Sequence, residues 1–165
     1  MRKSRTPVLD DLDAKILERY QPDTRLPARA IGEAVGLSTA AVQRRLQRLR
    51  EAGVIEREVA QVAPKAVGFP VTCLVAVELE REGGDHTARF RKRIAAFPEV
   101  QQCYGITGPA DFFLVVLAAD MEAYDAFTRR ALLSDENVRS FTTHVVLDRV
   151  KVGVDVPLGA ARRGR

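Results

Sequence analysis

Hydrophobic residues recur at helical spacing three times in the first third of the chain. The repeats predict helices over about residues 9–20, 27–35 and 38–53. Gly36 supplies a left-handed residue that ends the second helix, and Ser38 is a favourable N-cap for the third. The pattern therefore predicts two helices joined by a tight glycine turn, with another helix before them.

The remaining two thirds of the chain alternate between period-two and helical patterns. Strands are predicted over residues 71–80, 100–107, 112–119 and 140–152, and helices near 90–97 and over 121–132. The resulting order, β-α-β-β-α-β, is typical of an α+β, ferredoxin-like fold with both helices on one face of an antiparallel sheet. The other face is apolar and uncovered, which makes it a candidate for burial against a second subunit.

Breaks in these patterns divide the chain into two domains. Two prolines and a glycine in residues 63–70 predict a linker. Residues 54–62 contain β-forming residues and predict a short strand pair beside the third helix, which would make the first domain winged. The predicted organisation is a winged helix-turn-helix domain at 1–62, the linker at 63–70, a ferredoxin-like domain at 71–158 and a basic tail at 159–165.

The positive charge is concentrated at the N-terminal end. The net charge of the chain is +4, and residues 1–57 carry all of this excess. In the third predicted helix, Val42, Leu46 and Leu49 form one apolar stripe, whereas the opposite arc is basic and the helix has no acid before Glu51. Although a basic arc can be only a solvated face of a helical bundle, its position after a capped glycine turn indicates a DNA-binding helix-turn-helix.

Particular residues of the third helix suit the reading of DNA. A recognition helix enters the major groove by its N-terminal half, where small residues permit close approach and Gln and Arg reach the edges of adenine and guanine. Arg25, Arg48 and Arg50 are predicted to hold phosphates. The predicted DNA-binding residues are Arg25, Ser38, Thr39, Ala40, Gln43, Arg44, Gln47 and Arg48.

The composition disfavours several other kinds of protein. Cys73 and Cys103 lie in separate strand-like runs without metal-binding spacing and are expected to be reduced core thiols. His86 and His144 are isolated, so we expect no metal and no cofactor. The longest apolar run, 112–119, is far shorter than the ~20 residues of a membrane helix, and the N-terminus lacks a signal-peptide pattern. A cytoplasmic protein is expected.

One turn raises the question of a ligand. Between two apolar runs the chain reads CYGITGPADFFLVV, from Cys103 to Val116. Its centre, Gly108-Pro109-Ala110-Asp111, suits a hairpin turn because proline presets one backbone angle and glycine permits the left-handed region. An acid directly before Phe112 and Phe113 is compatible with a plain turn and with a binding site.

Four stretches together resemble the Lrp/AsnC, or feast/famine, family. They are LDDLDAKIL at 9–17, GLSTAAVQRRLQRLREAGVI at 36–55, GITGPADFFLVV at 105–116 and TTHVVLDRVK at 142–151. The resemblance implies a transcriptional regulator that binds double-stranded DNA and is associated with the nucleoid. It also implies a homodimer formed through the C-terminal domains, often assembled further into an octamer of four dimers, and an amino-acid or related effector bound between dimers.

The resemblance also implies an effector site at the turn. Gly108 and Asp111 match the family motif, and an amino acid offers its ammonium to an acid and its carboxylate to N–H and hydroxyl groups. Pro109 and Ala110 replace the acidic and aromatic residues that are common between them, so the identity of the effector is not carried over. The implied effector-binding residues are Tyr104, Thr107, Gly108, Asp111 and Thr143.

Two alternatives belong to other classes of function. A nucleoid-architectural protein would use the same helix-turn-helix but would need no ligand site at Asp111. A sirohaem decarboxylase-like enzyme would be expected to use a pocket rich in histidine and arginine, yet residues 54–68 contain no histidine. The sequence therefore favours a regulator over an enzyme.

Overall fold

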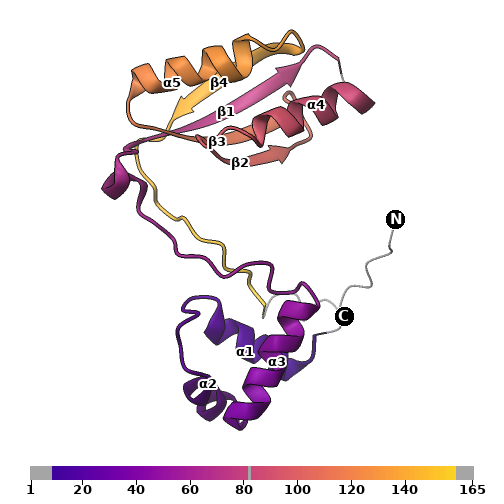
Figure 1. The fold of residues 1–165 in the computed structure, drawn as a ribbon, viewed down its shortest axis with the longest axis vertical. Helices are drawn as coiled ribbons and strands as arrows, with labels where there is room; N and C mark the ends of the chain where they lie inside the picture. The colour runs from indigo at the N-terminus through magenta and orange to yellow at the C-terminus, as the bar shows by residue number, and fades with distance from the viewer. Residues whose placement is uncertain (1–8, 82, 159–165) are drawn as a thin grey trace. The chain divides into compact units, whose positions relative to one another are not determined.

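The computed structural model describes residues 9–81 and 83–158, which form two compact units (Figure 1). Among the described residues, the helical unit combines 9–60 with 151–158, and the sheet unit lies within 61–150. Residues 151–158 group with the helical unit by their contacts, whereas the predicted end of the ferredoxin-like domain at residue 158 stays a prediction. The predicted linker 63–70 belongs to the sheet unit and contains a 3-10 helix, Pro64–Val67. The predicted tail, 159–165, lies outside the described residues.

Three helices build the helical unit, as the sequence predicts. They are α1 (Asp11–Tyr20), α2 (Ala28–Val35) and α3 (Thr39–Glu51). Ile16, Ile31 and Val42, one from each helix, are fully buried together. At the start of α1, Asp10 and Asp13 form a reciprocal capping box that satisfies two backbone N–H groups.

The turn between α2 and α3 depends on two glycines. Gly36 ends α2 in the left-handed region, with φ of 74°. The N–H of Leu37 donates to the carbonyl of Gly32 over 2.9 Å, and a β-carbon at Gly32 would lie 2.4 Å from the carbonyl oxygen of Leu37. Only glycine fits at position 32 without displacing the backbone that leads into α3.

A buried carboxylate joins α1 to α3. Asp13 has no exposed surface, and its side chain accepts hydrogen bonds from Arg45, over 2.8 Å, and from Arg48. Arg45 also pairs with Asp10 over 2.6 Å. Because a buried charge is costly unless it is compensated, this cluster fixes α3 against α1 at one relative position.

The wing predicted in residues 54–62 does not form a strand pair. No residue between α3 and the 3-10 helix belongs to a described strand. A side-chain cluster anchors the segment instead: Glu58 accepts hydrogen bonds from Tyr20 and from Arg50, the latter over 2.8 Å. Near the other end of the chain, the backbone of Val156 exchanges two hydrogen bonds with the side chain of Gln21, of 2.8 and 3.0 Å.

The sheet unit has the predicted ferredoxin-like order. Its elements are β1 (Val71–Leu79), α4 (Gly84–Ile94), β2 (Val100–Gly105), β3 (Phe112–Ala118), α5 (Met121–Thr128) with a π-helical continuation Arg129–Leu133, and β4 (Val138–Val145). The strands pair antiparallel in the order β2-β3-β1-β4, so β1 and β3 lie inside and β2 and β4 at the edges (Figure 1). The last strand ends at Val145, short of the predicted residue 152.

Only one face of this sheet carries the core. Val75, Val77 and Leu114 are fully buried, as are Phe90 of α4 and Phe127 of α5 in the same cluster. Both helices thus cover the same face, as predicted.

The other face of the sheet is apolar and has no helix over it in the described part of the chain. Its inner-strand residues alternate with the core residues and are half-buried; they include Leu74, Ala76, Phe113, Val115 and Leu117. An open apolar face is the feature that the sequence predicts for burial against a second subunit.

The two cysteines differ in exposure. Cys73 is buried in the core, as predicted, whereas Cys103 is exposed, which corrects the prediction of two core thiols. Cys103 pairs with the buried Leu114 and shares its face of the sheet, but it lies on the edge strand β2, where no further strand covers its flank.

The close contact at Gly32 yields a prediction for stability. Gly32→Ala should reduce the hydrogen-exchange protection of α2 and α3 by about 1–3 kcal/mol, because the added methyl group overlaps the Leu37 carbonyl. Gly153→Ala is the matched control, since no atom lies within 4 Å of its β-carbon position. Equal protection in the two variants would contradict this role of Gly32.

The buried cluster yields a second prediction. Asp13→Asn leaves Arg45 and Arg48 without a buried counter-charge, so hydrogen exchange in α1 and α3 should report a loss of about 1–3 kcal/mol. Asp23→Asn, which removes the charge of the exposed pair with Arg25, should leave protection close to that of the wild type. An Asp13→Asn variant as protected as the wild type would show that the ion pairs do not fix α3.

Candidate DNA-binding and effector sites

The surface formed by α3 presents most of the predicted DNA-binding residues together. The side chain of Ser38 accepts a hydrogen bond from the N–H of Ala41 over 3.2 Å and so caps the helix, as predicted. The outer residues are exposed: Thr39, Ala40, Gln43, Arg44, Gln47 and Arg48. Val42, Leu46 and Leu49 point into the core on the other side, which orients this outer face toward solvent.

Gln43 and Arg44 are the long polar side chains of this face that remain unengaged. Among the described residues, neither makes a hydrogen bond or an ion pair. Gln47 differs, because its amide donates to Glu51 over 2.8 Å. A bidentate amide and a bidentate guanidinium, one residue apart on an exposed helix, can each reach a base edge in a major groove.

The arginines predicted to hold phosphates have intramolecular partners. Arg48 pairs with the buried Asp13, and Arg25 pairs with Asp23 over 3.1 Å at the surface. Arg50 donates to Glu58 and, over 2.8 Å, to the hydroxyl of Tyr20. The structural role of Arg45 was missed by the sequence reasoning, although two acids in the capping region of α1 were a signal for a basic partner.

Hydrogen bonds shift the pKa values of the acids in these clusters. The hydrogen bond from Arg45 lowers the pKa of Asp10, and those from Tyr20 and Arg50 lower the pKa of Glu58. Burial, followed by the hydrogen bond to Glu58, raises the pKa of the Tyr20 hydroxyl. Both carboxylates therefore stabilise the folded form when ionised, and this stabilisation is lost as the pH falls through their lowered pKa values.

Asp111 has a structural role at the turn between β2 and β3. Its Oδ2 accepts a hydrogen bond from the N–H of Leu79 over 2.7 Å, and its own N–H donates to the carbonyl of Val77 over 2.9 Å. The turn closes with the N–H of Ile106 on the carbonyl of Asp111, also over 2.9 Å. Gly108 has φ of 120°, a conformation that other residues rarely adopt.

The remaining implied effector residues are not all gathered at this turn. Thr107 is exposed within the turn, and Tyr104 is 51% exposed and pairs with Phe113 on the open face. Thr143 pairs with Val75 on the helix-covered face, where its hydroxyl shares a hydrogen bond with Tyr124 of α5. Within one chain the structure therefore brings Tyr104, Thr107, Gly108 and Asp111 to one end of the sheet and directs Thr143 elsewhere.

Over 9–81 and 83–158, no group of three or more His, Cys, Asp or Glu side chains is placed to hold a metal ion. No helix in these same ranges has the length and apolarity that crossing a bilayer requires.

Comparisons with known proteins match both units of the chain. The model of the AsnC-type helix-turn-helix domain matches residues 9–50, and that of the Lrp/AsnC ligand binding domain matches residues 72–156. An uncharacterized HTH-type transcriptional regulator of Sinorhizobium fredii is 48% identical, over 91% of this chain and 89% of its own length. The Bkd operon transcriptional regulator of Pseudomonas aeruginosa is 35% identical, over 91% and 98%.

A solved structure agrees with these relatives. A transcriptional regulator from Neisseria meningitidis in complex with L-Met superposes with a TM-score of 0.87 at 30% identity, covering 93% of this chain and 99% of that one. The family and the relatives' names describe transcriptional regulators, not enzymes. The chain belongs to the Lrp/AsnC family of helix-turn-helix transcriptional regulators.

Proposed function

We propose that this regulator reads double-stranded DNA through Gln43 and Arg44 of α3, within a face completed by Ser38, Thr39, Ala40 and Gln47. The observation that carries the proposal is that these two side chains are exposed and have no partner among the described residues. Arg25 and Arg48 are proposed phosphate contacts. To contact a phosphate, each guanidinium must either bind the phosphate and its acidic partner at once or break its ion pair with that partner.

A homodimer suits this function. The open face of the sheet is apolar, and two copies joined there would bury it and present two recognition helices to a DNA with two half-sites. Assembly of four dimers into an octamer is the larger state that we propose. A DNA-binding regulator acts where the DNA lies, so we place the protein in the cytoplasm, associated with the nucleoid.

An amino acid is the proposed effector. The sheet unit matches a ligand binding domain, and the Neisseria relative was crystallised with L-Met. At the turn, the second carboxylate oxygen of Asp111 has no hydrogen-bond partner among the described residues, so it remains available to an ammonium group. Tyr104, Thr107 and Gly108 lie in the same region. Thr143 is the weakest member of the proposed site, because Tyr124 already engages its hydroxyl.

The first experiment identifies the DNA site. DNase footprinting over the gene's own upstream region, with and without a panel of amino acids, should give a protected operator whose pattern changes with the effector. Protection without any sequence preference would contradict the proposed regulator and favour the architectural protein.

Arg44 provides the sharpest test of sequence reading. If Arg44 contacts a guanine, Arg44→Ala should cost ~1–3 kcal/mol at the operator and relax the preference at one base pair. The control is a scrambled duplex of equal length, measured at the same salt concentration, on which the variant should lose little. An equal loss on both duplexes would reassign Arg44 to a phosphate contact.

Asp111 provides the corresponding test of the effector response. Asp111→Asn keeps an oxygen that accepts from Leu79 but removes the charge that would hold an ammonium, so effector-dependent changes in assembly should disappear while DNA binding remains. Sedimentation velocity with and without the effector measures this. Glu122→Gln, on the exposed start of α5, is the control. An unchanged response in Asp111→Asn would remove Asp111 from the site.

A further inference from the structure

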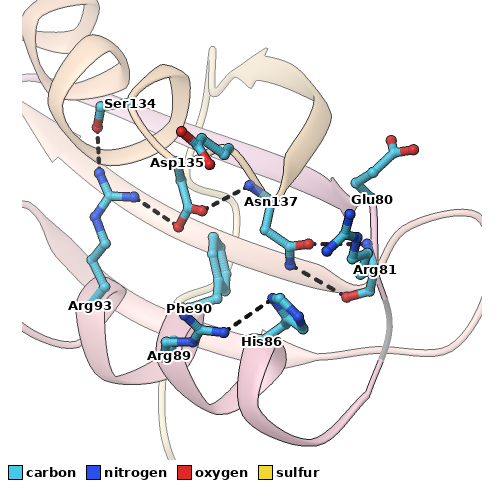
Figure 2. A pocket seen from close by; sticks show the side chains of 10 residues that line it. Glu80, Arg81, His86, Arg89, Phe90, Arg93, Ser134, Asp135 and Asn137 are labelled. Atoms are coloured by element: carbon cyan, nitrogen blue, oxygen red, sulfur yellow. Dashed lines mark hydrogen bonds and ion pairs between the residues drawn. The ribbon is translucent and has the colours of Figure 1, made fainter.

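A cavity lies within the sheet unit, away from the β2–β3 turn. Its volume is about 430 Å³, within the range of small-molecule sites. The walls come from residues 80–81 after β1, the first three turns of α4 and the loop 134–137 that leads into β4. Figure 2 shows the ring of Phe90 between His86 and Arg89 on one side and Asp135 and Asn137 on the other.

Hydrogen bonds hold the loop wall of this cavity in place. The side chain of Asn137 accepts from the N–H of Arg81 over 3.1 Å and donates to its carbonyl over 3.3 Å (Figure 2). The N–H of Glu80 donates to the carbonyl of Asn137 over 2.8 Å. The chain after β1 and the loop before β4 are therefore tied together, so the cavity exists before any ligand arrives.

One ion pair in the wall is already satisfied. Arg93 pairs with Asp135 over 2.8 Å and also donates to the carbonyl of Arg130 and to the hydroxyl of Ser134. The N–H of Asn137 donates to the other oxygen of Asp135 over 3.0 Å. This pair contributes no net charge to the cavity and serves as part of its frame.

Four other charges around the cavity lack an ion-pair partner. Among the described residues, Arg81 and Arg89 form no salt bridge, and neither do Glu80 and Glu136. The guanidinium of Arg89 makes only long contacts, of 3.3 Å to the carbonyl of Asp85 and 3.4 Å to Nδ1 of His86. The two positive and two negative side chains cancel in net charge, but none of the four has an ion-pair partner within the described part of the chain. Such a rim suits a ligand that itself carries both a positive and a negative charge.

We propose that this cavity is a second ligand site, which binds the zwitterion of a free α-amino acid. Arg89, beside His86, receives the carboxylate, and Glu136 on the opposite loop receives the ammonium. The side chain of the ligand lies against Phe90. Guanidinium–carboxylate and carboxylate–ammonium contacts are charge-assisted hydrogen bonds, the strongest class available to such a ligand. The inference rests on the proposed function, because it gives the effector-binding unit another site for the same class of ligand.

Isothermal titration calorimetry in the Asp111→Asn background tests this site apart from the turn. Each common α-amino acid is titrated separately into the full-length protein. At least one should bind, and Arg89→Gln or Glu136→Gln should weaken it about tenfold or more. Arg129→Gln is the matched control, since that exposed arginine pairs with Asp125 on α5 and does not line the cavity.

The chemistry of the ligand is tested with two derivatives of the best binder. The amide lacks the carboxylate and the N-acetyl derivative lacks the ammonium, so both should bind at least about tenfold more weakly than the parent amino acid. Tight binding of either derivative would overturn a site for zwitterions.

The two histidines of the chain locate the bound ligand. His86 lines the cavity, whereas His144 pairs with Leu74 of β1, away from it. Addition of the amino acid should shift the imidazole proton resonances of His86 and leave those of His144 in place. His144→Gln assigns the two signals.

The outcomes separate this inference from the proposed function. If Arg89→Gln leaves the affinity for the amino acid unchanged, the cavity is not the site. The same holds if the amino acid shifts only the imidazole resonances of His144. If no amino acid binds to the Asp111→Asn variant, the cavity site is also overturned. In that case, binding of an amino acid to the wild type would still support the effector site proposed at the turn, and a lack of binding to the wild type would contradict that site too.

Discussion

The carboxylate of Asp13, buried between α1 and α3, forms the ion pairs on which the orientation of α3 depends. It accepts from two arginines of α3 while its own backbone belongs to the capping box of α1. Close packing at Gly32 then fixes the approach of the chain to α3 from the other side. With both ends constrained, the outer face of α3 has little freedom to turn, which is the condition for reading base edges at fixed positions.

The same cluster divides the arginines of α3 into separate roles. Arg45 and Arg48 compensate the buried acid, Arg50 holds the segment after the helix through Glu58, and Arg44 alone projects without a partner among the described residues. The number of arginines on α3 therefore overstates how many guanidinium groups are free of an acid, whereas the net charge of +4 already counts these pairs.

Local signals in the sequence sufficed for most of the elements but not for long-range contacts. Gly36 and Ser38 act on adjacent residues, and the turn they predict is present. The prediction of a wing was wrong because β-forming residues need a partner strand, and the residues around Val59 have none in the described chain. Strand pairing is decided by tertiary structure, which the local pattern does not contain.

The candidate sites show the same division. The exposed face of α3 followed from helical periodicity, whereas the bond from Leu79 to Asp111 depends on the register of β1 against the turn. The alternation of apolar and polar residues predicted that Cys103 faces the core side of the sheet. It did not predict that Cys103 is exposed, because the pattern does not reveal which strand lies at the edge. The cavity residues come from three separate segments, so no motif united them.

The helical unit is discontinuous in sequence, because residues 151–158 belong to it and the side chain of Gln21 forms two hydrogen bonds with the backbone of Val156. Both covalent connections leave the sheet unit from neighbouring antiparallel strands, since β1 begins and β4 ends at the same end of the sheet. A chimaera that exchanges DNA-binding modules between relatives at one junction would thus combine α1 of one protein with the C-terminal segment of another. Exchange of the whole helical unit of this chain therefore requires two junctions, one on each side of the sheet unit.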